Sequence, residues 1–295
     1  MSDHHAPHAA DVREIVAAYL PEHPVDSVTR IGAGLDNVVY EASGGLIVRF
    51  SREPDPARLE AEARVLSAVA DISPVPVPEP VFTVTELGCL AYFKLPGRPL
   101  LDLPPTARAA HGTPIGATLG ELLATLHAAP AERFSGLVEA DDHPLTEWRG
   151  EAEANFAAVV AHVPVGHHRA VEAFLAAEPP GSAYTAVFSH NDLGIEHVLV
   201  DPVRWTVTGV IDWSDAGMVD PAYDLGLIYR DLGPAPARAA VESYRAAVDD
   251  STGLRERVTF YARCSVLEDL AYGVETGQES YTGKSIAALE WLFSA

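Results

Sequence analysis

The chain has 295 residues, of which 48% are hydrophobic and 21% are charged, a globular balance that excludes a disordered protein. Its 42 acidic residues against 20 basic ones give a net charge of −22. This charge argues against nucleic acid as a partner, because a phosphate backbone is bound by clustered Lys and Arg.

Other features concern the compartment. No apolar run approaches the roughly 20 residues that span a bilayer, so we expect no membrane association. Residues 1–10 contain no basic stretch leading into an apolar one, so we expect no secretory signal. Cys89 and Cys264 have neither metal-type nor redox-type spacing. These features predict a cytoplasmic protein and leave open whether it is a monomer or a dimer.

The first third of the chain predicts a helix and then short strands. Apolar residues repeat at helical spacing from Val12 to Leu20, and the helix should stop at Pro21. The predicted strands cover residues 25–31, 38–40, 46–50, 81–85 and 89–95, with a proline-rich stretch at 73–80. They are expected to form a five-stranded antiparallel sheet.

Two glycines lie between the first two strands, in Gly32-Ala33-Gly34. Glycines at such a turn let backbone amides approach a phosphate without a clashing side chain, although a plain tight turn explains them about as well. A strand rather than a helix follows, which excludes a dinucleotide-binding fingerprint.

Most of the remaining chain predicts helices. Ile115, Leu119, Leu122 and Leu126 mark a long buried helix. Further helices are predicted over residues 57–70, 147–162, 165–177, 235–248, 254–274 and 283–292. His127 is interpreted as a core histidine with satisfied hydrogen bonds rather than as a catalyst.

The stretch from residue 189 to 212 carries the chemistry. Two apolar runs, 198–200 and 207–211, predict two strands joined by a turn. Asp192 lies before the first run, and Asp212 closes the second. Kinase-type phosphotransferases use such an arrangement to place a base and a metal ligand at one site.

Two other motifs are set aside. Gly283-Lys284-Ser285 has the last letters of a P-loop, but its earlier glycine would fall at Gln278 and no strand precedes it. Ser189, His190 and Asp192 are too close in sequence for a hydrolase triad.

The ordered set of motifs resembles the aminoglycoside phosphotransferase family, including its macrolide-phosphotransferase-like members. The matching segments are the glycine loop, Arg49, Glu62, L-P-G-R-P-L at 95–100, H-N-D at 190–192, I-D-W at 211–213 and D-P-A-Y-D-L at 220–225. No single motif is decisive. The chain departs at His197, where most relatives carry Asn.

The resemblance implies an α+β, bilobal protein-kinase-like fold. Residues 1–96 would form a nucleotide-binding lobe with the five-stranded antiparallel sheet. Residues 97–295 would form a larger, mainly helical lobe for catalysis and substrate binding.

The resemblance also implies transfer of the γ-phosphoryl group of ATP or GTP to a hydroxyl of a small molecule. Asp192 is then the base, and His197 and Asp212 hold Mg²⁺. An alternative for His197 is a hydrogen bond to Asp212, or to a phosphate through a metal-bound water. Asp220 and Asp224 are expected to brace the catalytic loop. The implied nucleotide-binding residues are Gly32, Gly34, Arg49, Glu62, Phe93 and Leu95. The resemblance implies that Arg49 and Glu62 form an ion pair that holds the nucleotide's phosphates, and Glu62 is expected to face inward from its helix.

The acceptor has several alternatives. An aminoglycoside or another cationic antibiotic, such as a tuberactinomycin peptide, fits the acidic balance, although that balance is also explained by solubility. A macrolide is the main rival, because His in place of Asn also occurs in macrolide-type relatives. A small-metabolite kinase and a nucleotide-binding module without transfer activity are further alternatives. Glu268 and Asp269 are implied to bind amines, against the alternative of an exposed helix face.

Overall fold

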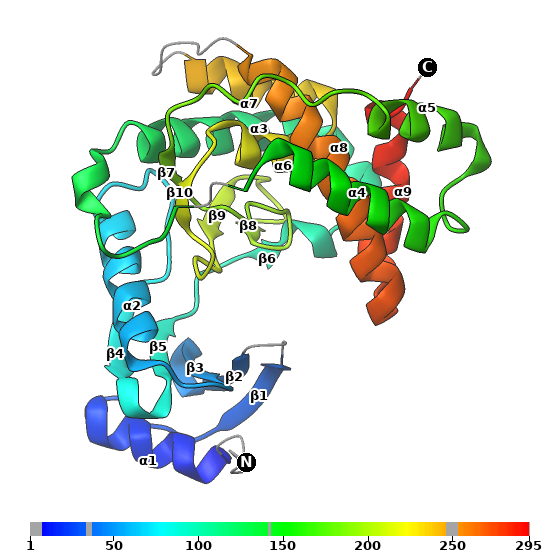
Figure 1. Ribbon diagram of the computed structural model, residues 1–295. Helices are drawn as coiled ribbons and strands as arrows, with labels where there is room; N and C mark the ends of the chain where they lie inside the picture. The colour runs from blue at the N-terminus through cyan, green and yellow to red at the C-terminus, as the bar shows by residue number, and fades with distance from the viewer. Residues whose placement is uncertain (1–7, 34–36, 141–142, 246–252, 295) are drawn as a thin grey trace. The chain divides into compact units, whose positions relative to one another are not determined.

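The computed structural model describes residues 8–33, 37–140, 143–245 and 253–294. The chain forms two compact units. Unit 1 comprises Met1–Leu95 and Phe134–Val138, and unit 2 comprises Pro96–Arg133 and Glu139–Ala295. Figure 1 shows the elements of both.

Unit 1 is built on the predicted five-stranded antiparallel sheet, in the order β1-β2-β3-β5-β4. The first strand begins at Val28 rather than at residue 25, and the last ends at Phe93 rather than at residue 95. The elements of this unit are α1 (Ala9–Tyr19), β1 (Val28–Ala33), β2 (Asn37–Ala42), β3 (Leu46–Ser51), α2 (Pro56–Ala70), β4 (Pro80–Val84) and β5 (Cys89–Phe93).

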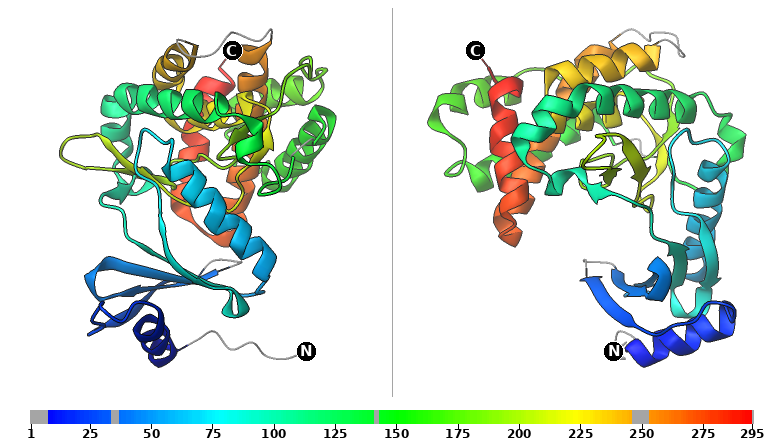
Figure 2. Two further views of the ribbon diagram at one scale, coloured as in Figure 1. Left: turned by 90° about the vertical axis from the view of Figure 1, so that its left-hand side faces the viewer. Right: turned by 180° about the vertical axis from the view of Figure 1, so that it is seen from behind.

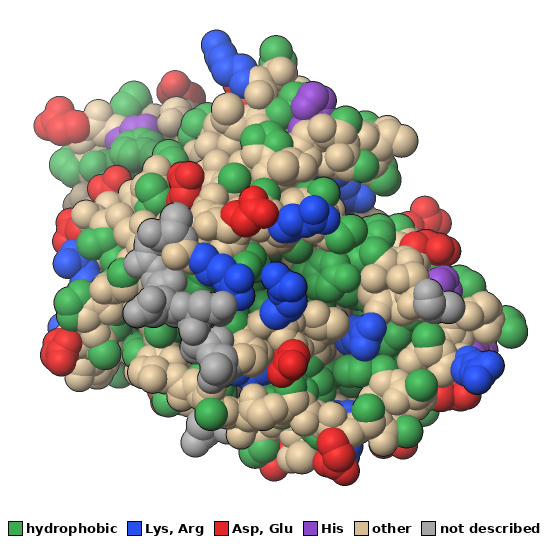
Figure 3. Space-filling model, turned by 90° about the horizontal axis from the view of Figure 1, so that it is seen from above, with side chains coloured by type: hydrophobic (Ala, Val, Ile, Leu, Met, Phe, Trp, Pro, Cys, Tyr) green, Lys and Arg blue, Asp and Glu red, His purple; other side chains and the backbone are tan. Residues whose placement is uncertain are grey.

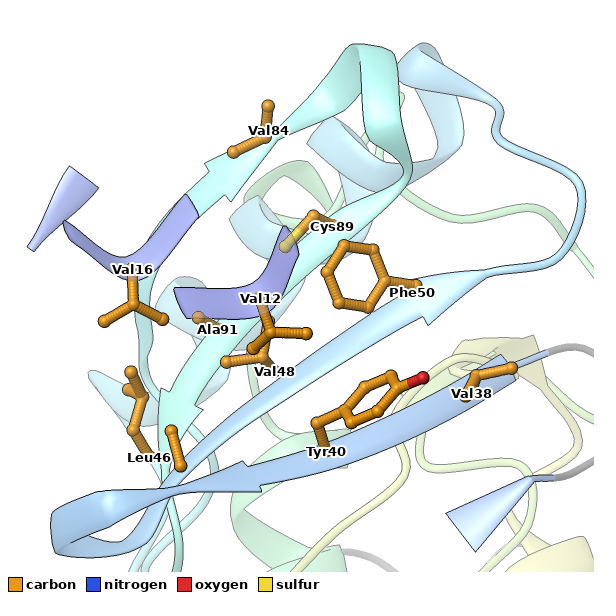
Figure 4. Close-up of a cluster of buried hydrophobic side chains, with 11 residues drawn as sticks. Val12, Val16, Val38, Tyr40, Leu46, Val48, Phe50, Val84, Cys89 and Ala91 are labelled. Carbon is orange, nitrogen blue, oxygen red and sulfur yellow. The ribbon is translucent and has the colours of Figure 1, made fainter. Parts of the chain in front are cut away.

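The core of unit 1 lies between α1 and one face of the sheet. Successive side chains of a strand point to opposite faces, and in β2 the buried positions are Val38, Tyr40 and Ala42. Val12 and Val16, one helical turn apart, bring α1 onto this face (Figure 4). Fully burying a valine contributes roughly 1.5–3 kcal/mol, so these two side chains supply much of the attachment of α1.

Unit 2 combines helices with two small antiparallel sheets, β6-β8-β9 and β10-β7. The two views of Figure 2 show α3 running beside α7, and α8 packs against α4, α6 and α9. The helices are α3 (Pro105–His127), α4 (Leu145–Val159), α5 (Val165–Leu175), α6 (Ala222–Leu232), α7 (Pro234–Arg245), α8 (Leu254–Thr276) and α9 (Glu279–Leu292). The strands are β6 (Arg98–Pro99), β7 (Val187–Ser189), β8 (Val198–Val200), β9 (Val207–Val210) and β10 (Gly217–Val219).

The hairpin predicted after the catalytic loop is confirmed as β8 and β9. The linker L-P-G-R-P-L adds β6 to its edge, and Gly97 makes this possible. With φ at 111° Gly97 adopts a conformation that favours glycine, and a Cβ there would lie 2.9 Å from the carbonyl oxygen of Val200. The linker therefore stabilises the hairpin by pairing β6 with β8 at its edge.

Two further findings concern the helices. The motif D-P-A-Y-D-L begins α6, a helix that the sequence analysis did not predict. The helix predicted over 235–248 is found as α7, and its positions 246–248 lie outside the described residues. None of the described helices combines the length and apolar character that a membrane crossing needs.

His127 is a core histidine, as predicted. Its Nε2 lies 3.0 Å from the Ser189 hydroxyl and its Nδ1 lies 3.1 Å from the Tyr244 hydroxyl. Because the Ser189 hydroxyl donates to Asp224, Nε2 must carry the proton and Nδ1 must accept from Tyr244. Burial lowers the pKa of His127 to about 3.

This pKa predicts a loss of stability in acid. In the unfolded state His127 takes up a proton near pH 6.5, whereas in the folded state it stays neutral well below that pH. The contribution of His127 to the free energy of unfolding is therefore complete above pH 6.5 and decreases as the pH falls. The free energy of unfolding should decrease by about 1.4 kcal/mol between pH 7.5 and 5.5 through this residue alone. Urea unfolding of wild type and His127→Gln at both pH values measures it. A difference between the two proteins that is independent of pH would contradict the assignment.

Candidate active site

One buried carboxylate shapes the loop 189–197 between β7 and β8. Asp224 of α6 is 1% exposed. It accepts hydrogen bonds from the Ser189 hydroxyl at 2.5 Å, from the Asn191 backbone N–H at 2.9 Å and from the Leu193 backbone N–H at 3.1 Å. These donors flank Asp192 on both sides, so a single side chain fixes the backbone around it. The prediction that Asp224 braces this loop is confirmed.

The same prediction is wrong for Asp220, which braces α8 instead. Its carboxylate accepts hydrogen bonds from Arg257 Nε at 2.7 Å, from the Tyr261 hydroxyl at 3.2 Å and from the Ala222 backbone N–H at 2.9 Å. Arg257 and Tyr261 both lie on α8. The motif D-P-A-Y-D-L therefore supplies one carboxylate to the catalytic loop and one to a helix.

Hydrogen bonds also join the segments that carry Asp192 and Asp212. His190 Nε2 donates to the carbonyl oxygen of Ile211 at 3.0 Å, and the Ile211 N–H donates to the carbonyl oxygen of His197 at 3.0 Å. His190 is fully buried, with its ring 4.6 Å from that of Trp213. The two acidic segments are thus held together by their backbones and by a buried imidazole.

Two residues of these segments adopt the left-handed backbone conformation. Asn191 has φ at 62° and Asp212 has φ at 64°, a region that non-glycine residues seldom occupy. The Asn191 amide donates to the carbonyl oxygen of Asp215 at 3.1 Å, and the Ser214 hydroxyl donates to Asp212 at 3.0 Å. Such conformations persist where surrounding bonds enforce them, and they cluster at functional sites.

His197 lies between the two carboxylates. Its Nε2 is hydrogen-bonded to Asp192 Oδ2 at 3.0 Å, and its Nδ1 is 3.9 Å from Asp212 Oδ2. The side chains of Asp192 and Asp212 are 40% and 46% exposed, whereas that of His197 is 17% exposed. The structure therefore brings together the three residues predicted to carry catalysis and metal binding.

Burial alone would lower the pKa of His197. The hydrogen bond to Asp192 and the charges of Asp192, Glu196 and Asp212 together outweigh burial, so the pKa of His197 is raised to about 9. For Asp192, burial would raise the pKa, but the hydrogen bond and positive charge of His197 lower it below its usual range. At neutral pH the pair is an imidazolium and a carboxylate.

Unit 1 contains the ion pair that the family resemblance implies for Arg49 and Glu62. Arg49 of β3 donates through Nη2 to Glu62 of α2, and both side chains are mostly buried. Because successive side chains of a strand alternate, Arg49 projects from the opposite face to Val48 and Phe50, which face the core of α1. The prediction that Glu62 faces inward is confirmed, whereas the phosphate-binding role of the pair stays a prediction.

The positions of the other predicted nucleotide-binding residues do not test their roles. Gly32 lies in β1, and Gly34 lies outside the described residues. Phe93 ends β5 opposite Leu46, with its side chain exposed, and Leu95 follows two residues later. Their roles toward a nucleotide base stay predictions.

The neighbouring acids of α8 have different environments. Asp269 is buried, accepts a hydrogen bond from the Ser285 hydroxyl at 2.7 Å and lies 3.3 Å from Lys284 Nζ. The Asp269 carboxylate is occupied by these buried contacts, so it is not a candidate for binding substrate. Glu268 is exposed, which keeps it available to a ligand.

Glu268 lies in acidic and aromatic surroundings that sequence reasoning missed. Partial burial raises the pKa of Glu268, Arg230 opposes this, and the charges of Asp269, Glu151 and Asp192 raise it further. Burial and the charges of Glu268 and Asp192 raise the pKa of Tyr223. The Tyr223 ring lies 5.2 Å from that of Trp148 on α4. The only sequence signal was the spacing of Trp148 and Glu151, three residues apart on one helix face.

Comparison with known proteins identifies the sequence family. The chain matches the phosphotransferase enzyme family over residues 27–261. It is 30% identical to a viomycin phosphotransferase from Streptomyces vinaceus over 282 residues, which cover 90% of this chain and 94% of that protein.

Solved structures agree with this assignment. A macrolide 2'-phosphotransferase from Brachybacterium faecium is 26% identical, with a TM-score of 0.65 and coverage of 95% of this chain and 97% of that one. The GDP complex of aminoglycoside 2'-phosphotransferase-IIIa shares the fold at 20% identity, with a TM-score of 0.68 and coverage of 98% and 99%. The chain therefore belongs to the phosphotransferase enzyme family.

Proposed function

We propose that this phosphotransferase moves the γ-phosphoryl group of ATP or GTP to a hydroxyl of a cationic antibiotic, with viomycin or a related cationic peptide as the first acceptor to test. The observation that carries the proposal is the arrangement of Asp192, His197 and Asp212 on braced segments. The relationship to a viomycin phosphotransferase supports the choice of acceptor. Modification of such an antibiotic would confer resistance.

Asp192 orients the acceptor hydroxyl in this proposal. Its carboxylate is ionised and partly exposed, and the bonds to Asp224 fix the backbone on either side. A carboxylate with a lowered pKa is a weak base. Phosphoryl transfer passes through a loose transition state in most analyses, so positioning the hydroxyl matters more than early removal of its proton.

Mg²⁺ is the metal implied by this reaction. The described residues contain no group of three or more His, Cys, Asp or Glu side chains arranged for a metal. Kinase-type sites nevertheless hold Mg²⁺ with one or two carboxylates and the substrate phosphates. Asp212 fits this role because its carboxylate is exposed. When bound, the ion neutralises charge on the phosphates.

The contacts of His197 favour a different role from metal ligation. Its Nε2 donates to the Asp192 carboxylate, so this nitrogen has no lone pair for a metal. The charges of Asp192, Glu196 and Asp212 raise its pKa and favour the imidazolium. We therefore propose that Asp212 holds the metal and that His197 acts as the charged partner of Asp192. This differs from the ligand role implied by the family resemblance.

Arg49 is proposed to bind the phosphates of the nucleotide. Its guanidinium is a planar fork suited to phosphate oxygens, and Glu62 fixes its orientation. Phe93, Leu95 and the glycine loop of Gly32 and Gly34 are proposed to complete nucleotide binding in unit 1, as the resemblance implies.

The acceptor is proposed to meet Glu268, Glu151 and the rings of Trp148 and Tyr223. Carboxylates attract amines, and aromatic faces attract cations at close range. The net charge of the whole chain contributes less. Figure 3 shows one face on which Lys and Arg side chains lie among acidic ones, so the acidic excess forms no uniform surface there.

An acceptor panel tests this proposal. We expect wild type to transfer label from γ-labelled ATP or GTP to viomycin faster than to kanamycin, a macrolide or small alcohols. Glu268→Gln should raise the acceptor KM several-fold, whereas Glu275→Gln, also exposed on α8, should not. The acceptor KM should rise with ionic strength, because salt screens attraction between charges, while the nucleotide KM changes less.

Other results of the panel have definite meanings. Preference for a macrolide, with a KM independent of salt, would contradict a cationic acceptor. Absence of labelled product with every acceptor would contradict transfer to these classes of molecule.

His197→Asn tests the role of the imidazole. We expect the ratio of kcat with Mn²⁺ to kcat with Mg²⁺ to stay within about twofold of wild type, because residue 197 does not contact the ion. Values of kcat itself should fall, since Asp192 loses a charged partner worth roughly tenfold in rate. A marked shift of preference toward Mg²⁺ would show that the imidazole ligates the metal, because an amide oxygen is the harder ligand.

A further inference from the structure

Lys284, in the motif that mimics a P-loop, is a buried cation. It lies on α9 with its side chain only 3% exposed. Its Nζ is 3.0 Å from Glu196 Oε2, 3.3 Å from Asp231 Oδ1 and 3.3 Å from Asp269 Oδ2. The ring of Tyr281 lies 4.9 Å from the same ammonium. The residue therefore has no P-loop role and instead joins three carboxylates.

Two of these carboxylates hold the catalytic loop. Glu196 belongs to the loop and directly precedes His197. Asp231 of α6 accepts a hydrogen bond from the Ile195 backbone N–H at 3.1 Å. The Ile195 carbonyl oxygen accepts from the Leu101 N–H at 3.1 Å, so both backbone groups of Ile195 are held. Lys284 is thus one contact away from the backbone that separates Asp192 from His197.

Glu196 folds back across its own loop to reach this ammonium. A Cβ on Gly194 would lie 2.6–2.7 Å from the Glu196 carboxylate group, a distance that real side chains do not tolerate. A Cβ at position 194 would therefore push the flexible end of the Glu196 side chain aside. The close approach shows that the Glu196 side chain packs against the loop backbone and does not extend into solvent.

The charges make Lys284 necessary to this cluster. Arg230 donates to Asp231 through Nε and Nη2, each at 2.8 Å. Arg230 and Lys284 together face Glu196, Asp231 and Asp269, and all five side chains are largely buried. Removal of the ammonium would leave the three carboxylates with Arg230 and with the half-buried Arg108, whose charge interacts with Asp231 and Glu196. Loss of one of the positive charges in a buried cluster favours rearrangement or entry of water.

We propose that Lys284 is a positioning residue for phosphoryl transfer, because its contacts with Glu196 and Asp231 fix the loop between Asp192 and His197. The inference rests on the proposed catalytic role of that loop. The reacting groups lie beyond Glu196 and Ile195, so Lys284 acts through them and does not touch substrate. A displacement of about 1 Å at a catalytic group costs on the order of 10² in rate.

Lys284→Met tests this role, because it keeps an unbranched side chain and removes the charge. We expect kcat to fall roughly tenfold to a hundredfold, with the nucleotide KM within about twofold of wild type. Hydrogen exchange of the 192–198 backbone should become faster. Glu196→Gln should reproduce both effects, and the double variant should be no worse than the stronger single variant, because both changes break the same contact.

Ser285→Ala is the matched control. Its hydroxyl donates to Asp269 in the same cluster, and among the described residues it makes no hydrogen bond to the loop 189–197. The control should lower the melting temperature but leave both kcat and loop exchange within about twofold of wild type. If Lys284→Met does not fold, Glu196→Gln carries the test alone.

A failure of the positioning role can be distinguished from a failure of the proposed function. Wild-type kcat and loop exchange in Lys284→Met or in Glu196→Gln would overturn the positioning role, as would equal effects of Ser285→Ala. An inactive wild type would instead contradict the proposed function, and the exchange measurement would still report whether Lys284 fixes the loop.

Discussion

The structure around the candidate active site depends on one carboxylate, that of Asp224. It is almost completely buried and accepts three hydrogen bonds from residues 189, 191 and 193. A charged acceptor with its hydrogen bonds satisfied is stable in the interior, whereas an unsatisfied one is costly. The loop 189–197 is therefore attached to α6, and the packing of α6 in unit 2 sets the position of the loop. This explains how Asn191 retains a left-handed backbone and how the backbone on either side of Asp192 is fixed.

Several carboxylates in unit 2 act inside the protein. Asp220 pairs with Arg257. Asp231 and Asp269 lie close to Lys284, and Asp269 also lies close to Arg230. Buried ion pairs are a weak source of stability, but they require specific geometry. What they provide here is a fixed geometry for the loop 189–197, whose backbone N–H groups donate to Asp224 and Asp231. The acidic excess of the sequence is thus partly structural, and only exposed carboxylates such as Glu268 are available to a cationic ligand.

The sequence predicted the elements whose periodicity is strong. The sheet of unit 1 and the hairpin β8–β9 follow from short apolar runs separated by turn residues. The pairing of Arg49 with Glu62 follows from the family resemblance. The environment of Asp269 did not follow, because α8 is buried on most of its surface and periodicity cannot identify its exposed face. The sequence around Lys284 shows only that it does not form a P-loop. The partners of Lys284 are far from it in the sequence, so no local pattern indicates them. The contact of His197 with Asp192 likewise depends on how the loop folds between them.

The most direct test of the account is the activity of Asp192→Asn. The amide keeps the size of the side chain and the backbone bonds to Asp224, but it loses the negative charge that faces the acceptor hydroxyl. The account predicts nucleotide affinity within about twofold of wild type, and a loss of roughly 10²–10⁴ in single-turnover transfer rate. A transfer rate close to that of wild type would remove Asp192 from the mechanism and contradict the account.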